Sequence, residues 1–108
     1  MLRGEIYWVD LGDGQGSEQR GMRPAIIVSN DSINRNSTVV TVIPCTSKSK
    51  GNYAYHLQLS LYSGRVSTLL AEQIRTIDKQ RVKQKIGSLS ADKMVYVNRI
   101  IRIAMGME

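Results

Sequence analysis

The chain has 108 residues, of which 42% are hydrophobic and 22% are charged. This length and balance predict one globular domain over residues 1–108 and exclude a disordered chain. No run approaches the roughly 18 apolar residues that a membrane span needs, and the first residues lack the apolar segment of a signal peptide. We therefore expect a soluble, cytoplasmic protein with no membrane association.

Positive charge is concentrated in the second half of the chain. The formal net charge is +6 and the sequence pI is about 9.8. Residues 72–102 carry eight lysines or arginines against three acidic residues. A basic surface of this kind favours polyanions, of which nucleic acid is the commonest in cytoplasm. A solvated basic face that serves only solubility would explain the charge equally well.

Short apolar runs separated by turn residues predict a mainly β fold, either a small β-barrel or a strongly bent sheet. The expected strands cover residues 4–10, 25–29, 38–44, 55–59, 65–70 and 72–77. Asn30, Asp31 and Ser32 supply the residue types of a turn. Pro44 is expected to end the third strand, because proline cannot donate to a central ladder.

Two helices are expected after these strands. A short one is expected near Asp78, which is a suitable N-cap. The last and clearest one follows Ser90, and its apolar side chains recur at helical spacing from Met94 through Val97 to Ile101. This helix has more apolar surface than one groove on a small barrel needs. The surplus favours a homodimer.

The single cysteine and the single histidine each have a simple explanation. Cys45 follows an apolar, strand-like run and is interpreted as a small buried thiol. A Cys–His nucleophile with His56 is the alternative, but nothing in the sequence orients the imidazole. His56 alternates with apolar Tyr55 and Leu57. We interpret it as a residue on the polar face of a strand and not as a catalyst.

The segment between the first two strands is longer than a turn requires. Two to five residues are enough to connect such strands, whereas residues 12–23 add hydroxyl, carboxylate and amide groups and two guanidinium groups. Binding and catalytic groups concentrate on loops held by a rigid sheet. We therefore expect this loop to be functional.

Four segments, taken in order, make the sequence specific. They are RGEIYWVDL at residues 3–11, GSEQ followed by RP at residues 16–24, VIPCTS at residues 42–47 and EQIRTIDK at residues 72–79. Together they resemble the MazF/PemK (Kid) family of toxin–antitoxin endoribonucleases, or mRNA interferases, over nearly the whole chain. Arg20 departs from this pattern, because the family often has a small residue there.

The resemblance implies a compact SH3-like, PemK-type β-barrel with a C-terminal α-helix, in a symmetric homodimer. It implies metal-independent, sequence-specific cleavage of single-stranded RNA without a cofactor. It also implies inhibition by a cognate antitoxin, whose acidic tail would occupy the RNA groove. Arg20 could alter which RNA is preferred.

RNA cleavage without a metal needs deprotonation of the 2′-OH, stabilisation of the phosphate and protonation of the departing 5′ oxygen. One histidine excludes a two-histidine mechanism within a protomer, and the scattered acidic residues show no metal-ligand spacing. An arginine-centred site remains. Arg23 is expected to stabilise the phosphate charge with its planar fork of donors, together with the hydroxyl of Thr46. Glu18 is either a base, an orienting partner of Arg23, or a brace for the loop.

Other residues are expected to bind the RNA. Ser17 and Gln73 are suited to base edges, and Lys48 and Lys50 to backbone phosphates. The full set of predicted RNA-binding residues is Ser17, Gln19, Arg20, Lys48, Lys50, Gln73 and Arg75. Arg75 also matches a position implicated in catalysis in some relatives, so both of its roles stay open. Trp8 and Tyr7 either pack in the core or stack on bases.

Two other functions compete with the ribonuclease. The first is a non-enzymatic, CcdB-type gyrase poison, which relies on a C-terminal tryptophan segment. The only tryptophan here is Trp8, and the chain ends in Met-Gly-Met-Glu. The second is an SH3-like nucleic-acid-binding module, which explains the charge but leaves the polar loop before Arg23 and Pro24 without a role.

Overall fold

The computed structural model describes residues 1–48 and 51–107. These residues form the strands β1 (Glu5–Asp10), β2 (Met22–Ile27), β3 (Val39–Thr46), β4 (His56–Tyr62), β5 (Arg65–Leu70), β6 (Arg75–Asp78) and β7 (Val82–Ser88). The helices are α1 (Asp31–Asn36) and α2 (Ala91–Ala104), with 3₁₀ turns η1 (Ala71–Gln73) and η2 (Lys79–Arg81). The predicted mainly β fold with a C-terminal helix is confirmed.

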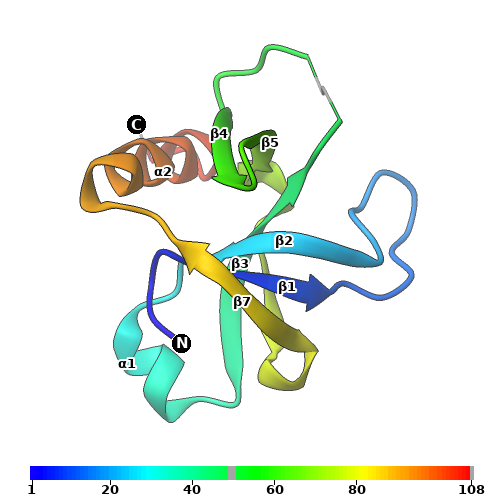
Figure 1. Cartoon of the computed structure of the whole chain (residues 1–108), viewed down its shortest axis with the longest axis vertical. Helices are drawn as coiled ribbons and strands as arrows, with labels where there is room; N and C mark the ends of the chain where they lie inside the picture. Colours follow the sequence, from blue (N-terminus) through cyan, green and yellow to red (C-terminus); the bar gives the residue numbers. More distant parts are fainter. Residues whose placement is uncertain (49–50, 108) are drawn as a thin grey trace.

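The strands form one antiparallel sheet in the order β4-β5-β3-β2-β1-β7, and β6 also pairs with β3. β3 is shared by two parts of the sheet. Its first half pairs with β6, and its last two residues, Cys45 and Thr46, pair with β5. The sheet is curled into a half-barrel, and α2 packs beside β4 and η1 (Figure 1).

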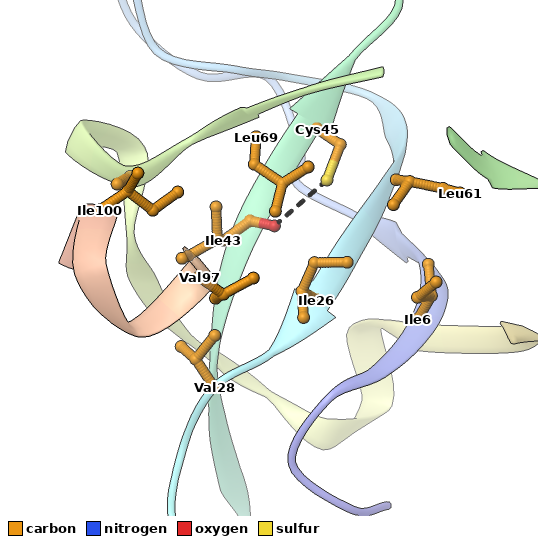
Figure 2. Close-up of a cluster of buried hydrophobic side chains, with 10 residues drawn as sticks. Ile6, Ile26, Val28, Ile43, Cys45, Leu61, Leu69, Val97 and Ile100 are labelled. Carbon is orange, nitrogen blue, oxygen red and sulfur yellow. Dashed lines mark hydrogen bonds between the residues drawn. The ribbon is translucent and has the colours of Figure 1, made fainter. Parts of the chain in front are cut away.

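The main core lies between the curled sheet and α2. Figure 2 shows Ile26 and Ile43 from the two central strands beside Val97 from the helix. All three side chains are fully buried. A second cluster lies around Val9 and Val40. Burial of this apolar surface is the main stabilising term of the fold, at about 25 cal/mol per Å².

The terminal helix begins where the sequence predicts. The Ser90 hydroxyl accepts a hydrogen bond from the backbone N–H of Lys93, and Asp92 lies in the first turn, where its negative charge suits the helix dipole. Val97 is buried, whereas Val95 on the opposite side is 61% exposed. The short turn near Asp78 is also confirmed, as η2, with the Asp78 carboxylate capping the N–H of Gln80.

Predicted strand boundaries are wrong in β2, β3 and β4. β2 ends at Ile27 and not at residue 29, and β4 covers His56–Tyr62 and not residues 55–59. β2 begins at Met22 and not at residue 25, because the ladder with β1 continues through Arg23, which lies opposite Val9. β3 continues past Pro44 to Thr46. Proline is tolerated there because one edge of β3 changes its partner from β6 to β5 around this residue, so the ladder is already interrupted.

Three other elements differ from the prediction. The expected turn at residues 30–32 opens a helix, α1, because the Asn30 side chain caps the N–H of Ser32. The expected strand at residues 72–77 is divided between η1 and β6. β7 was not predicted, because exposed Lys83, Gln84 and Lys85 mask its alternation on an edge of the sheet.

Candidate active site

The loop between β1 and β2 is closed at its base by backbone hydrogen bonds. The N–H of Leu11 donates to the carbonyl of Gly21 (2.9 Å), and the N–H of Gly21 donates to the carbonyl of Gly12 (2.8 Å). Gly21 has φ of +74°, which a residue with a side chain rarely adopts. The loop therefore leaves the sheet as a closed, shaped excursion and returns directly into β2.

Arg23, the second residue of β2, is held by this loop. Its Nε donates a hydrogen bond of 3.0 Å to the backbone carbonyl of Arg20. The residue is half-buried and fixed in the ladder with β1. Because Nε is engaged, the two terminal amino groups of the guanidinium remain as the donors that can face a ligand.

Arg23 opens onto a hollow of about 170 Å³. The residues around it are Gly16, Ser17, Glu18, Gln19, Arg20, Arg23 and Lys48. They include three cationic side chains and a single carboxylate, that of Glu18. Glu18 forms no ion pair within 4 Å among residues 1–48 and 51–107. The hollow thus presents a net positive charge that suits a phosphate group.

Thr46 lies next to this hollow but is buried. Its side chain is at the end of β3 and is 2% exposed, and its hydroxyl accepts a hydrogen bond from the N–H of Lys48 at 3.2 Å. In the β2–β3 ladder, Ala25 lies opposite Pro44. Continuing the same register for two residues sets Thr46 level with Arg23, although Thr46 is not among the residues that line the hollow.

Gln73 and Arg75 approach the same loop from the other side. The Gln73 amide accepts from the N–H of Gln19 (3.3 Å) and donates to the carbonyl of Ser17 (3.2 Å). Arg75 extends Nη1 to 3.5 Å from the carbonyl of Leu11. A hollow of about 330 Å³ includes Arg75 together with Glu18. Glu18 therefore lines both the Arg23 hollow and the Arg75 hollow.

His56 is more buried than the sequence indicates. Its side chain is only 6% exposed, and Nε2 lies 2.8 Å from the Glu72 carboxylate. The imidazole packs edge-on against Tyr53 and Tyr55. His56 does begin strand β4 and bonds to a polar partner, as a residue on the polar face of a strand, but its side chain is buried. The two tyrosines flank the imidazole and shield it.

Sequence reasoning did not single out the aromatic residues before β4. Tyr53, Tyr55 and His56 share a hollow of about 230 Å³ with Ser17 and Gln19 of the loop. The sequence signal that could have indicated this cluster is the occurrence of two tyrosines and a histidine within four residues at the start of a strand.

Lys50, which was predicted to bind RNA, lies outside the described residues.

Cys45 is a core residue, as predicted. It is fully buried, and its Sγ lies 3.7 Å from the carbonyl of Ile43 (Figure 2). Burial raises the pKa of the Cys45 thiol, which disfavours the thiolate that a nucleophile requires. Trp8 is half-buried and packs edge-on against Tyr62, which favours its packing role.

The part of the chain that the structure describes contains no group of three or more His, Cys, Asp or Glu side chains able to hold a metal ion. In that part, too, no helix is long and apolar enough to cross a bilayer. The site is thus a cationic hollow between the β1–β2 loop, the start of β2 and the residues that follow β3. The fold and the hollow together define a class of protein: a small β-barrel with a candidate active site that suits an anion.

The chain belongs to the family described as PemK-like, MazF-like toxins of type II toxin–antitoxin systems, whose sequence model matches residues 2–105. It is 40% identical over 111 aligned positions to an endoribonuclease MazF of Staphylococcus saprophyticus. That match covers 99% of this chain and 92% of the relative. The resemblance drawn from the four sequence motifs is confirmed.

Solved structures agree with this family. A MazF from Deinococcus radiodurans superposes with a TM-score of 0.86 at 27% identity, covering 99% of this chain and 97% of that one. A MazE–MazF structure from the same organism gives a TM-score of 0.77 at 27% identity, covering 100% and 97%. The chain is thus a MazF-family toxin, and its named relative supports endoribonuclease activity.

Proposed function

We propose that this chain cleaves single-stranded RNA in the cytoplasm by attack of a 2′-OH on the adjacent phosphate, and that the Arg23 hollow binds that phosphate. The observation that carries the proposal is the group of three cations, Arg20, Arg23 and Lys48, around one hollow of phosphate-compatible size and charge. The relative named an endoribonuclease supports RNA as the substrate. The other two candidate functions have no comparable support.

Arg23 is the centre of the proposed mechanism. Negative charge accumulates on the phosphate oxygens as the 2′ oxygen attacks, and donors fixed before the reaction stabilise that charge without reorganising. Arg23 meets this requirement because β2 fixes its backbone and the Arg20 carbonyl fixes its Nε. The terminal amino groups then form a planar fork toward the phosphate. Thr46 is proposed to supply a hydroxyl donor from the adjacent strand.

Glu18 is the carboxylate proposed to act on the 2′-OH or to orient Arg23. It lines the hollow without an ion pair in the described part of the chain. A carboxylate in that state is free to accept a proton from a substrate hydroxyl within hydrogen-bond reach. The departing 5′ oxygen then takes a proton, and a donor of the cationic hollow or water supplies it.

The remaining contacts are assigned to RNA on both sides of the cleaved bond. Ser17, Gln19 and Arg20 are proposed to contact RNA from the loop, and Lys48 and Arg75 to bind neighbouring phosphates. These cations make binding dependent on salt, because each phosphate contact releases counterions. Lys48 is exposed, which suits this role.

An antitoxin and a second copy of the chain are the proposed protein partners. MazE–MazF complexes among the similar structures support an antitoxin. An acidic segment of that partner would compete with RNA for the cationic hollow. The exposed side of α2, with Val95 at 61% and Tyr96 at 55% exposure, offers an apolar surface for the homodimer.

The test is the chemistry of the RNA ends. The purified full-length chain is incubated with a long RNA of varied sequence in EDTA, and both new ends are analysed at each cleavage site. We expect cyclic phosphate at one end and 5′-OH at the other. Ends bearing a 5′-phosphate would contradict 2′-OH attack, and an intact RNA library would contradict the enzyme assignment.

A further inference from the structure

The Gln73 side chain is bonded to the backbone of the β1–β2 loop and not to solvent. Its Nε2 donates to the carbonyl of Ser17, and its Oε1 accepts from the N–H of Gln19. These two backbone groups lie two residues apart. One side-chain amide therefore pairs with the loop as a neighbouring strand would. It satisfies a donor and an acceptor that have no backbone partner within residues 1–48 and 51–107.

The bonded segment leads directly to Arg23. Arg20 follows Gln19, and its carbonyl accepts the hydrogen bond from Arg23 Nε. The next residue, Gly21, donates its N–H to the carbonyl of Gly12 at 2.8 Å. Because this N–H and the Arg20 carbonyl belong to one planar peptide, the base of the loop holds the carbonyl from the C-terminal side. The Gln73 amide holds the same segment from the N-terminal side, at Ser17 and Gln19, so its removal would leave Arg20 anchored on one side only.

Gln73 is itself on a rigid support. It is the last residue of η1, and Ala71 at the other end of that turn is completely buried in the main core. Glu72 between them is bonded to His56 on β4 at 2.8 Å. The core and β4 therefore fix the backbone from which Gln73 extends, so the β1–β2 loop is anchored to the main core through Gln73.

We propose that Gln73 is a positioning residue that fixes the loop so that the Arg20 carbonyl aims the Arg23 guanidinium into the hollow. This differs from the expectation that Gln73 reads base edges, and it rests on the proposed ribonuclease function. A displacement of about 1 Å in a catalytic group can cost about a hundredfold in rate. Removing the Gln73 amide should therefore slow cleavage at every site without changing which sites are cleaved.

The kinetic test compares Gln73→Ala with Gln84→Ala, which removes an exposed amide on β7. We expect kcat of Gln73→Ala to fall about ten- to a hundredfold, with KM and sequence preference close to those of the wild type. Gln84→Ala should cleave like the wild type. Relaxed preference at one base position, or an unchanged kcat, would overturn the positioning role.

A second measurement needs no RNA. Amide hydrogen exchange of the free protein reports whether the loop is held, because the Gln19 N–H is bonded to Gln73. We expect exchange at Gln19 to rise about tenfold in Gln73→Ala and to stay unchanged in Gln84→Ala. Unchanged exchange at Gln19 in Gln73→Ala would overturn the inference. A wild type that cleaves no RNA would instead overturn the proposed function and leave this readout intact.

Discussion

The Glu5 carboxylate ties the start of β1 to β7 and should make stability depend on pH. It accepts hydrogen bonds from Lys85 Nζ (2.6 Å), from the N–H of Leu2 (2.7 Å) and from the hydroxyl of Tyr7 (2.9 Å). The Lys85 bond is the main cause that lowers the pKa of Glu5 from 4.5 to about 2, against the raising effect of burial.

The magnitude follows from this pKa shift. At 1.36 kcal/mol per pKa unit, the full shift would correspond to about 3 kcal/mol of folding stability. Lys85 is 48% exposed, so solvent screens the pair. We therefore expect about 1 kcal/mol. Because the folded pKa is the lower one, this contribution is complete above about pH 4.5 and is lost as the pH falls through about 2.

The assay is urea unfolding of Glu5→Gln and the wild type at pH 7 and pH 3. We expect the variant to be about 1 kcal/mol less stable at pH 7 and the difference to fall to about half or less at pH 3. Asp13→Asn, which changes an exposed carboxylate without a hydrogen bond in the described residues, is the control. An equal loss at both pH values would refute the electrostatic explanation.

Three further predictions test the fold. Ile43→Ala should cost about 2–5 kcal/mol in urea unfolding because Ile43 is fully buried, whereas Ile33→Ala, at 47% exposure, should cost less than about 1 kcal/mol; similar losses would contradict the assigned core. Ser90→Ala should lower the unfolding free energy by about 1 kcal/mol through loss of the α2 cap, and Ser88→Ala should not. Cys45 should react with a thiol reagent only after urea unfolds the chain, and rapid labelling of the native protein would oppose its burial.

The predictable part of the fold is the part whose sequence signals are local. The apolar runs at β1, β3 and β5 and the Ser90 cap are read from neighbouring residues. The continuation of β3 beyond Pro44 cannot be read from neighbouring residues, because it depends on a change of partner strand from β6 to β5. β7 is missed for a similar reason. Its lysines look like loop residues until pairing with β1 makes them the outer face of an edge strand.

The candidate site was predicted as a set of residues and not as a geometry. The polar loop before Arg23 marks the site in the sequence, and the structure brings the loop, Arg23 and Lys48 around one hollow. Sequence spacing could not show that the Arg20 carbonyl holds Arg23 or that Gln73 spans 54 positions to reach Gln19. Both are long-range or backbone contacts, which have no signature in residue type.

The central claim is that Arg23 stabilises the phosphate during RNA cleavage. The most direct measurement is the single-turnover cleavage rate of Arg23→Ala in EDTA, with Arg35→Ala as the control because Arg35 is exposed on α1. We predict a loss of at least about a hundredfold for Arg23→Ala at an unchanged melting temperature, and a wild-type rate for Arg35→Ala. A folded Arg23→Ala protein that cleaves RNA within a few-fold of the wild-type rate would contradict the account.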